Sequence, residues 1–164
     1  MVKKILKCTL RVVIFIILYL LQIYIVNKTT FFGVTGDLCL MAVALTALTT
    51  SNISAYITAG ICGMVSDLLF LTGSLKYTVI YIIVVAILIE LKKLYKQDTK
   101  MAIIIFSVAA TIIREIIMLI FNVVQTGEFV NIFVYIFNIL KQSIINICLG
   151  YIIYLAFKLC RQKE

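Results

Sequence analysis

The chain has 164 residues and a formal net charge of +8; 64% of its residues are hydrophobic and only 13% are charged. Soluble domains are about 45–50% apolar and about 25% charged, and a compact domain of this length cannot bury so much apolar surface. With a mean hydropathy of +1.18, the composition predicts an integral membrane protein. It argues against a disordered chain, a coiled coil and a secreted disulfide scaffold.

The side chains needed for most catalysis and metal binding are scarce. The chain contains no histidine, so it lacks the residue that exchanges protons near neutral pH. The cysteines form no C-x-x-C pair, and their odd number and wide spacing do not match a disulfide framework. They are Cys8, Cys39, Cys62, Cys148 and Cys160. We interpret them as small apolar fillers of membrane helices, and we expect no enzyme, no cofactor and no metal site.

Six apolar segments predict six transmembrane helices, all α, in a single membrane domain over residues 1–164. Their approximate bounds are 5–26, 34–50, 53–72, 75–91, 101–124 and 129–157. No small-x-small cleavage site follows the first segment, so we expect an uncleaved helix and not a signal peptide. The polar stretch 27–37 is expected as a loop outside the membrane. The second segment is short for a span of about 20 residues, so it either extends over 34–50 or tilts and kinks.

The basic residues predict the orientation of these helices. Only Lys28 and Lys76 lie in loops on one side of the six-span topology, whereas eleven basic residues lie on the other. By the positive-inside rule the eleven are cytoplasmic, which places both termini on the cytoplasmic side of the membrane. They also explain the net charge without a nucleic-acid partner. The eleven are Lys3, Lys4, Lys7, Arg11, Lys92, Lys93, Lys96, Lys100, Lys158, Arg161 and Lys163.

Small residues mark one face of the third predicted span. Ala55, Ala59, Gly63 and Asp67 recur at intervals of four, and Gly60 flanks them. Such a stripe lets a neighbouring backbone approach closely, because packing between membrane helices relies on small residues and hydrogen bonds.

The fifth and sixth predicted spans each carry a polar stripe, which is the least ordinary feature of the sequence. The fifth has Ser107, Thr111, Arg114, Met118, Asn122 and Gln125, with Glu115 at the edge; the sixth has Asn131, Asn138, Gln142, Asn146 and Gly150, with Lys141 beside them. A charge at mid-bilayer costs a few kcal/mol, and the charges of Arg114, Lys141, Asp67 and Glu115 sum to zero. We therefore expect them to pair with one another. Because Arg114 and Glu115 are adjacent and point in different directions, each should find its partner on another helix.

Two interpretations of this polar network remain open. It forms a transport path or a ligand-binding pocket, or it fixes helix register and the docking of a partner. The second is favoured, since no ligand is indicated by the residues. A membrane enzyme using Asp67 or Glu115 for acid–base chemistry ranks below both, because a lone carboxylate does not define a reaction.

The order of elements over residues 33–91 resembles the rod shape-determining protein MreD family. The resemblance rests on Gly36-Asp37-Leu38, a short helix rich in alanine, and Gly60-x-x-Gly63-x-x-x-Asp67-Leu68, followed by a tyrosine-bearing helix and a basic loop. The family usually has proline before the first aspartate, where this chain has Gly36. The resemblance implies that Asp37, Gly60, Gly63 and Asp67 serve helix packing or partner docking.

A member of this family is a non-enzymatic subunit of the bacterial elongation machinery. The resemblance implies that the chain regulates cell shape and lateral peptidoglycan synthesis by docking an MreC-like protein. A RodA-like polymerase, a penicillin-binding transpeptidase and an MreB-like filament are the further expected partners.

The family is thought to share its six-helix fold with the substrate-binding component of energy-coupling-factor vitamin transporters, which is the alternative function. That component usually needs an Ala-x-x-x-Ala face on its first helix, and the first span here contains no alanine. The nearest equivalent is Ala55-x-x-x-Ala59 on the third. The chain also has no tryptophan and no long external loop that could stack on a vitamin ring.

Overall fold

The computed structural model describes residues 20–22, 24, 33–69, 74–94, 99–127 and 131–162, and these form helices with no β-strand. The helices are α2 (Leu38–Thr49), α3 (Asn52–Leu69), α4 (Lys76–Leu94), α5 (Thr99–Thr126) and α6 (Ile132–Gln162). The predicted all-α class is therefore confirmed. The first predicted span, 5–26, lies outside the described residues except for 20–22 and 24.

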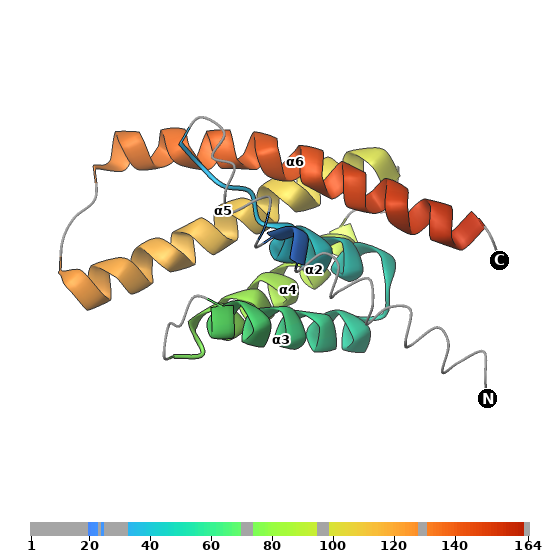
Figure 1. The fold of residues 1–164 in the computed structure, drawn as a ribbon, viewed down its shortest axis with the longest axis horizontal. Helices are drawn as coiled ribbons and strands as arrows, with labels where there is room; N and C mark the ends of the chain where they lie inside the picture. Colours follow the sequence, from blue (N-terminus) through green and yellow to red (C-terminus); the bar gives the residue numbers. More distant parts are fainter. Residues whose placement is uncertain are drawn as a thin grey trace.

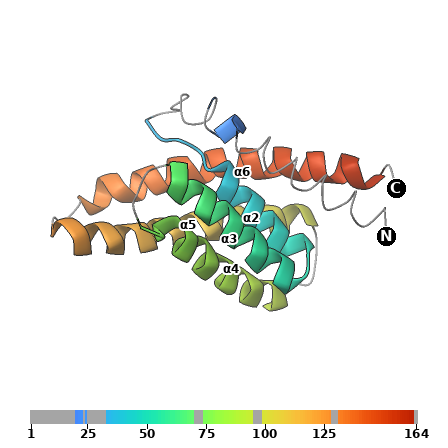
Figure 2. The ribbon, with the colours of Figure 1, turned by 60° about the horizontal axis from the view of Figure 1, so that its bottom comes forward.

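The helices form a short group, α2 to α4, that packs against a long pair, α5 and α6 (Figure 1). Helix α2 lies at the centre, in contact with α3, α4, α5 and α6. Its residues 38–47 are all buried. Figure 2 shows that the short group crosses the pair obliquely and leaves it uncovered where α5 leads into α6. Helix α2 is thus the core about which the other helices pack.

Helices α5 and α6 are the two in the described part of the chain that are long and apolar enough to cross a membrane. The qualifying stretches are Met101–Thr126 and Ile132–Leu155, close to the predicted bounds 101–124 and 129–157. Helices α3 and α4 begin and end within a few residues of 53–72 and 75–91. The end of α4, however, carries Glu90, Lys92 and Lys93, so its apolar part is short.

The expectation of a helix over 34–50 is wrong at its start. Helix α2 has 12 residues and is about 18 Å long, which is little more than half of a bilayer's hydrocarbon core of about 30 Å. It begins late because Asp37 is its N-cap, with extended backbone (φ −128°, ψ 96°) and a side chain that accepts from Leu40 N. Residues 33–37 are non-helical, as expected for a loop, but Asp37 is buried within the protein.

The small-residue stripe of α3 packs inside the molecule. Ala55 and Ala59 are fully buried, and a Cβ on Gly63 would collide with Thr78 Cα and lie 2.9 Å from Thr78 N. The absence of a side chain at Gly63 therefore allows the backbones of α3 and α4 to touch. At Gly60, by contrast, a Cβ would meet nothing within 4 Å.

Lys92, near the C-terminal end of α4, binds the C-terminal end of α2. Lys92 Nζ donates to the carbonyl oxygens of Ala47 and Thr50, both at 3.0 Å. The last carbonyls of a helix lack partners within the helix and carry partial negative charge, so an ammonium group stabilises them.

Candidate functional site

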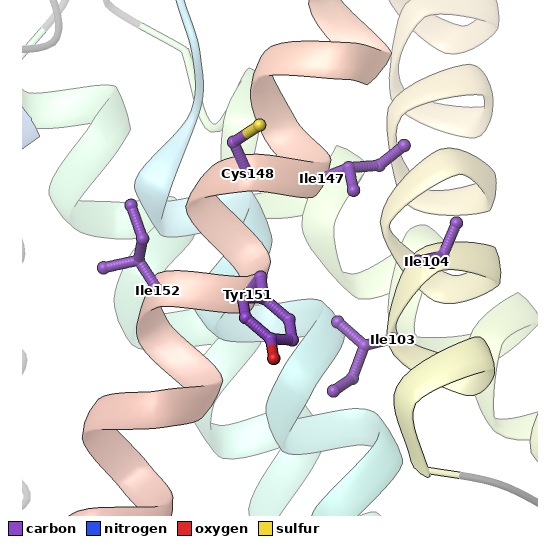
Figure 3. A pocket seen from close by; sticks show the side chains of 6 residues that line it. All are labelled: Ile103, Ile104, Ile147, Cys148, Tyr151 and Ile152. Carbon is purple, nitrogen blue, oxygen red and sulfur yellow. The ribbon is translucent and has the colours of Figure 1, made fainter.

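A groove runs between α5 and α6 on the surface of the molecule (Figure 3). It has a volume of about 380 Å³ and is lined by Ile103, Ile104, Ile147, Cys148, Tyr151 and Ile152. The thiol of Cys148 and the phenol hydroxyl of Tyr151 are the only polar groups among these side chains. Ligand pockets combine apolar walls with a few convergent polar groups, and this groove lacks such a set.

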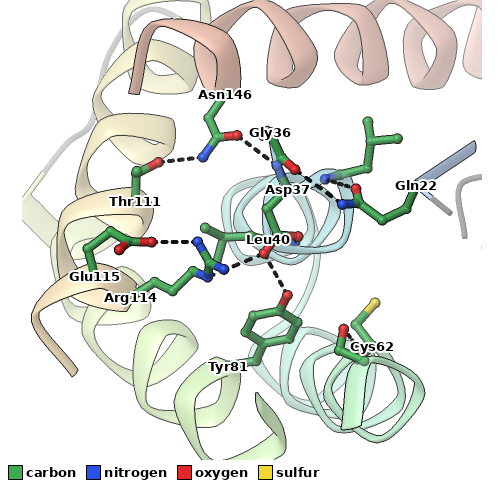
Figure 4. Close-up of polar contacts among 12 residues, drawn as sticks. Gln22, Gly36, Asp37, Leu40, Cys62, Tyr81, Thr111, Arg114, Glu115 and Asn146 are labelled. Atoms are coloured by element: carbon green, nitrogen blue, oxygen red, sulfur yellow. Dashed lines mark hydrogen bonds and ion pairs between the residues drawn. The ribbon is translucent and has the colours of Figure 1, made fainter. Parts of the chain in front are cut away.

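The candidate site is instead a buried cluster of polar groups around Asp37, where α2 begins (Figure 4). Oδ1 of Asp37 accepts from the backbone N–H of Leu40 at 2.8 Å. Oδ2 accepts from the hydroxyl of Tyr81 on α4 at 2.8 Å and lies 3.4 Å from Nε of Arg114 on α5. One carboxylate thus caps α2 and joins it to two other helices.

Side-chain amides complete the hydrogen bonds of the extended backbone before α2. Gln22 donates from Nε2 to the carbonyl of Gly36 at 3.1 Å, and its Oε1 accepts from Leu38 N at 2.7 Å. The N–H of Asp37 donates to Asn146 Oδ1 at 2.9 Å, and Asn146 Nδ2 donates to the hydroxyl of Thr111 at 2.9 Å. Buried backbone groups need such partners where no regular ladder supplies them.

The second carboxylate of the cluster is Glu115. Its Oε1 lies 2.6 Å from Nη1 of Arg114, and the two side chains are 14% and 13% exposed. The hydroxyl of Tyr135 on α6 donates to the Glu115 carbonyl at 2.6 Å and to Oε2 at 3.1 Å. With its amide oriented to satisfy both neighbours, Gln142 donates to Glu115 Oε1 at 3.1 Å and accepts from Arg114 Nη1 at 2.7 Å.

The expected pairing of the deep charges is therefore partly wrong. Arg114 does find a partner off its own helix, but that partner is Asp37. The adjacent residues Arg114 and Glu115 also meet, because the long arginine side chain can bend across the helix face to the neighbouring carboxylate. Burial favours this contact, since a lone charge in an apolar interior costs more than an imperfectly placed pair.

Asp67 lies at a different place in the fold. It is buried on α3, where Oδ1 accepts from Tyr77 N at 2.7 Å. Oδ2 accepts from the N–H and the hydroxyl of Thr78 at 3.0 and 2.7 Å. These donors belong to the first turn of α4, so Asp67 acts as a cap supplied by another helix.

The other two residues predicted for the network, Asn138 and Lys141, lie on α6. Nζ of Lys141 lies 4.4 Å from the ring centroid of Phe137. Asn138 is half-buried one turn before Gln142 on α6.

Three cluster members were not singled out from the sequence: Gln22, Tyr81 and Tyr135. A signal existed for Gln22, because it is the one amide in the apolar run from residue 12 to 26. Nothing local distinguishes Tyr81 or Tyr135, since tyrosines also suit the edges of membrane helices.

Chemically, the cluster is a network in which the described donors and acceptors are paired, except that the buried Nε of Arg114 makes no hydrogen bond and only the 3.4 Å ion-pair contact with Asp37 Oδ2. Both carboxylates face the guanidinium of Arg114, and amide or hydroxyl groups take up the neighbouring positions. Among the described residues no three His, Cys, Asp or Glu side chains are placed to hold a metal ion. The arrangement joins α2, α4, α5 and α6 through side chains of the protein itself. No family model, curated protein or solved structure matches the chain.

Proposed function

We propose that the chain is a non-enzymatic membrane subunit that docks other membrane proteins, as an MreD-like component of the bacterial elongation complex. In this proposal it crosses the plasma membrane six times with both termini in the cytoplasm. Its partners are an MreC-like protein, a RodA-like polymerase, a penicillin-binding transpeptidase and an MreB-like filament.

The observation that carries the proposal is that the deep polar groups bond to one another. Asp37, Arg114, Glu115 and Asn146 all contact protein partners at 2.6–3.4 Å. A network of this kind specifies one arrangement of helices, because each group is costly to bury without its partner. It is better suited to a rigid scaffold than to a transport path, which needs groups free to bind and release a ligand.

The two elements that carry the family resemblance support the same proposal. Asp37 and Asp67 each cap a helix, and Gly63 lets α3 touch α4. These residues serve packing within the chain. Of the four residues implied by the resemblance, Gly60 is left to face outward, and we propose that the open side of α3 at Gly60 is a docking surface.

The outer face of α3 around Gly60 is broadly apolar. Ile57, Ile61, Met64 and Leu68 are 52–75% exposed. In a membrane such a face contacts lipid or a partner helix, and a glycine in it lets a helix approach closely.

The test is a mild-detergent pull-down of the tagged chain after crosslinking in cells, read by mass spectrometry. Recovery of MreC-like, RodA-like and transpeptidase proteins is the expected result. Recovery of paired ATPases with a transmembrane coupling subunit would contradict it and indicate a vitamin transporter, as would a large thermal stabilisation by a vitamin. Recovery of neither group would also contradict it.

Variants at position 60 sharpen this test. We expect Gly60→Leu to fold, because its side chain enters open space, but to lose most of the recovered MreC-like protein. Gly60→Ala is the matched control, since it adds a single methyl group. Equal recovery from the two variants would remove α3 from the docking surface. Asp67→Leu should also disrupt the complex, through loss of the cap on α4.

A further inference from the structure

The backbone before α2 enters the molecule at the middle of the two long helices. Asp37 contacts Arg114, the sixteenth of the 28 residues of α5. Its N–H bonds to Asn146, the fifteenth of the 31 residues of α6. Figure 1 shows this stretch running in from the end where α5 leads into α6. The start of α2 therefore lies about halfway along both helices.

This position has a consequence for residues 33–37 if α5 and α6 cross the membrane. Extended backbone at the depth of the hydrocarbon core is tolerated only where protein buries it and satisfies its polar groups. Gly36 and Asp37 are buried. A Cβ on Gly36 would lie 2.5 Å from Leu149 Cδ1 and 2.9 Å from Ile145 Cγ2, so a larger residue at this position would require these side chains of α6 to shift.

We propose that residues 33–37, called the strap here, and α2 together form one interrupted membrane span: the strap reaches mid-depth and α2 completes the crossing as a half-membrane helix, with its start held by the ion pair between Asp37 and Arg114. Arg114 is a positioning residue in this arrangement. The proposal goes beyond the docking function and does not depend on which partners bind. It rests only on the crossing of the membrane by α5 and α6.

The carboxylate at the start of α2 explains why this helix needs Arg114 in order to enter the membrane. A helix of 12 residues is too short to be inserted as a span on its own, and it begins at a carboxylate that is costly to place in lipid. Arg114 lies on a helix that is long and apolar enough to cross a membrane. Because α2 precedes α5 in the chain, the strap docks only after α5 is in place.

The test measures how fast a single cysteine in the strap reacts with a membrane-impermeant maleimide. The purified full chain, with its own five cysteines replaced by alanine, is placed in lipid nanodiscs, which are open on both faces. Thr35→Cys reports on the half-buried strap. Ser74→Cys, in the exposed turn before α4, is the surface reference, and Val85→Cys, fully buried in α4, reports on the fold.

We expect Thr35→Cys to react about tenfold or more slowly than Ser74→Cys, since the reagent must wait for local opening. Arg114→Met should remove most of this difference and leave the rate at Val85→Cys unchanged. The double change Asp37→Asn and Arg114→Met should restore slow labelling, because asparagine still caps the helix and carries no charge.

Three results would overturn the proposal. Equal rates at positions 35 and 74 in the parent chain would place the strap at the surface. Slow labelling retained in Arg114→Met would show that the ion pair does not hold it. Labelling of Val85→Cys in Arg114→Met would show loss of the whole fold and no local release of the strap. None of these depends on the pull-down, so the two proposals can fail separately.

Discussion

Asp37 and Asp67 perform the same local task in two different surroundings. Each is a buried carboxylate that accepts hydrogen bonds from the first turn of a helix. Asp67 accepts from residues ten and eleven positions further along the chain. Asp37 is joined to Tyr81, 44 positions away, and to Arg114 on α5. A cap assembled from neighbours belongs to a local motif, whereas a cap that needs a distant cation depends on the whole fold.

The comparison also separates the two halves of the molecule. Around Asp67, α3 and α4 approach through Gly63 and form a compact hairpin. Around Asp37, α2 meets the long pair through charges and amides. We expect the first region to be sensitive to side-chain volume and the second to charge.

The largest expected effect is that of Arg114→Met. It leaves Asp37 and Glu115 buried without their cation, and breaking a buried ion pair by removing one partner costs about 3–5 kcal/mol. Unfolding of the purified chain by a denaturing detergent measures the loss. The double variant Asp37→Asn and Arg114→Met should lose less unfolding free energy than the two single variants lose together, because the two residues are coupled. Additive losses would contradict the ion pair.

The next effect is that of Gly63→Ala. The added methyl group meets the backbone of Thr78, which cannot move without separating α3 from α4, and overpacking of this kind costs about 1–3 kcal/mol. Gly60→Ala is the control on the same helix. We expect it to leave the free energy of unfolding unchanged or to raise it by up to about 1 kcal/mol, because alanine favours the helix more than glycine does. The same unfolding measurement compares them. Equal losses at positions 60 and 63 would show that the α3–α4 contact does not depend on glycine.

A smaller effect is expected for Asp67→Ala. Loss of a helix cap costs about 0.5–2 kcal/mol, and Asp67→Asn should retain part of it because the amide oxygen still accepts. Hydrogen exchange of the Tyr77 and Thr78 amides locates the change, since these N–H groups lose their acceptor. Unchanged exchange at both amides would show that the cap is dispensable.

The smallest effects concern the two lysines at the end of α4. Lys92 bonds two carbonyls at the end of α2, so Lys92→Met should cost about 0.3–1 kcal/mol. Lys93 pairs with Glu90 at 2.6 Å, and both side chains are about two-thirds exposed. Exposed pairs contribute little, and Lys93→Met should be nearly neutral. A larger loss from Lys93→Met than from Lys92→Met would reverse this ranking.

The sequence could predict those features that depend on composition and on the spacing of apolar, small or polar residues within one segment. The apolar content, the long helices α5 and α6, the inward stripe of α3 and the deep position of Arg114 all follow from residues within one helix. The ends of α3, α4 and α5 all lie within three residues of their predicted bounds. Gln22 could have been found as well, because it interrupts an otherwise apolar run.

The tertiary structure alone decided which groups meet. Nothing within residues 27–37 indicates that Asp37 turns inward, because a carboxylate after a polar stretch normally stays in water. Its burial becomes favourable only when Arg114, Tyr81 and Asn146 arrive from three other helices and supply the countercharge and donors. The sequence by itself therefore determined the helices of this protein, and long-range electrostatics determined where α2 begins.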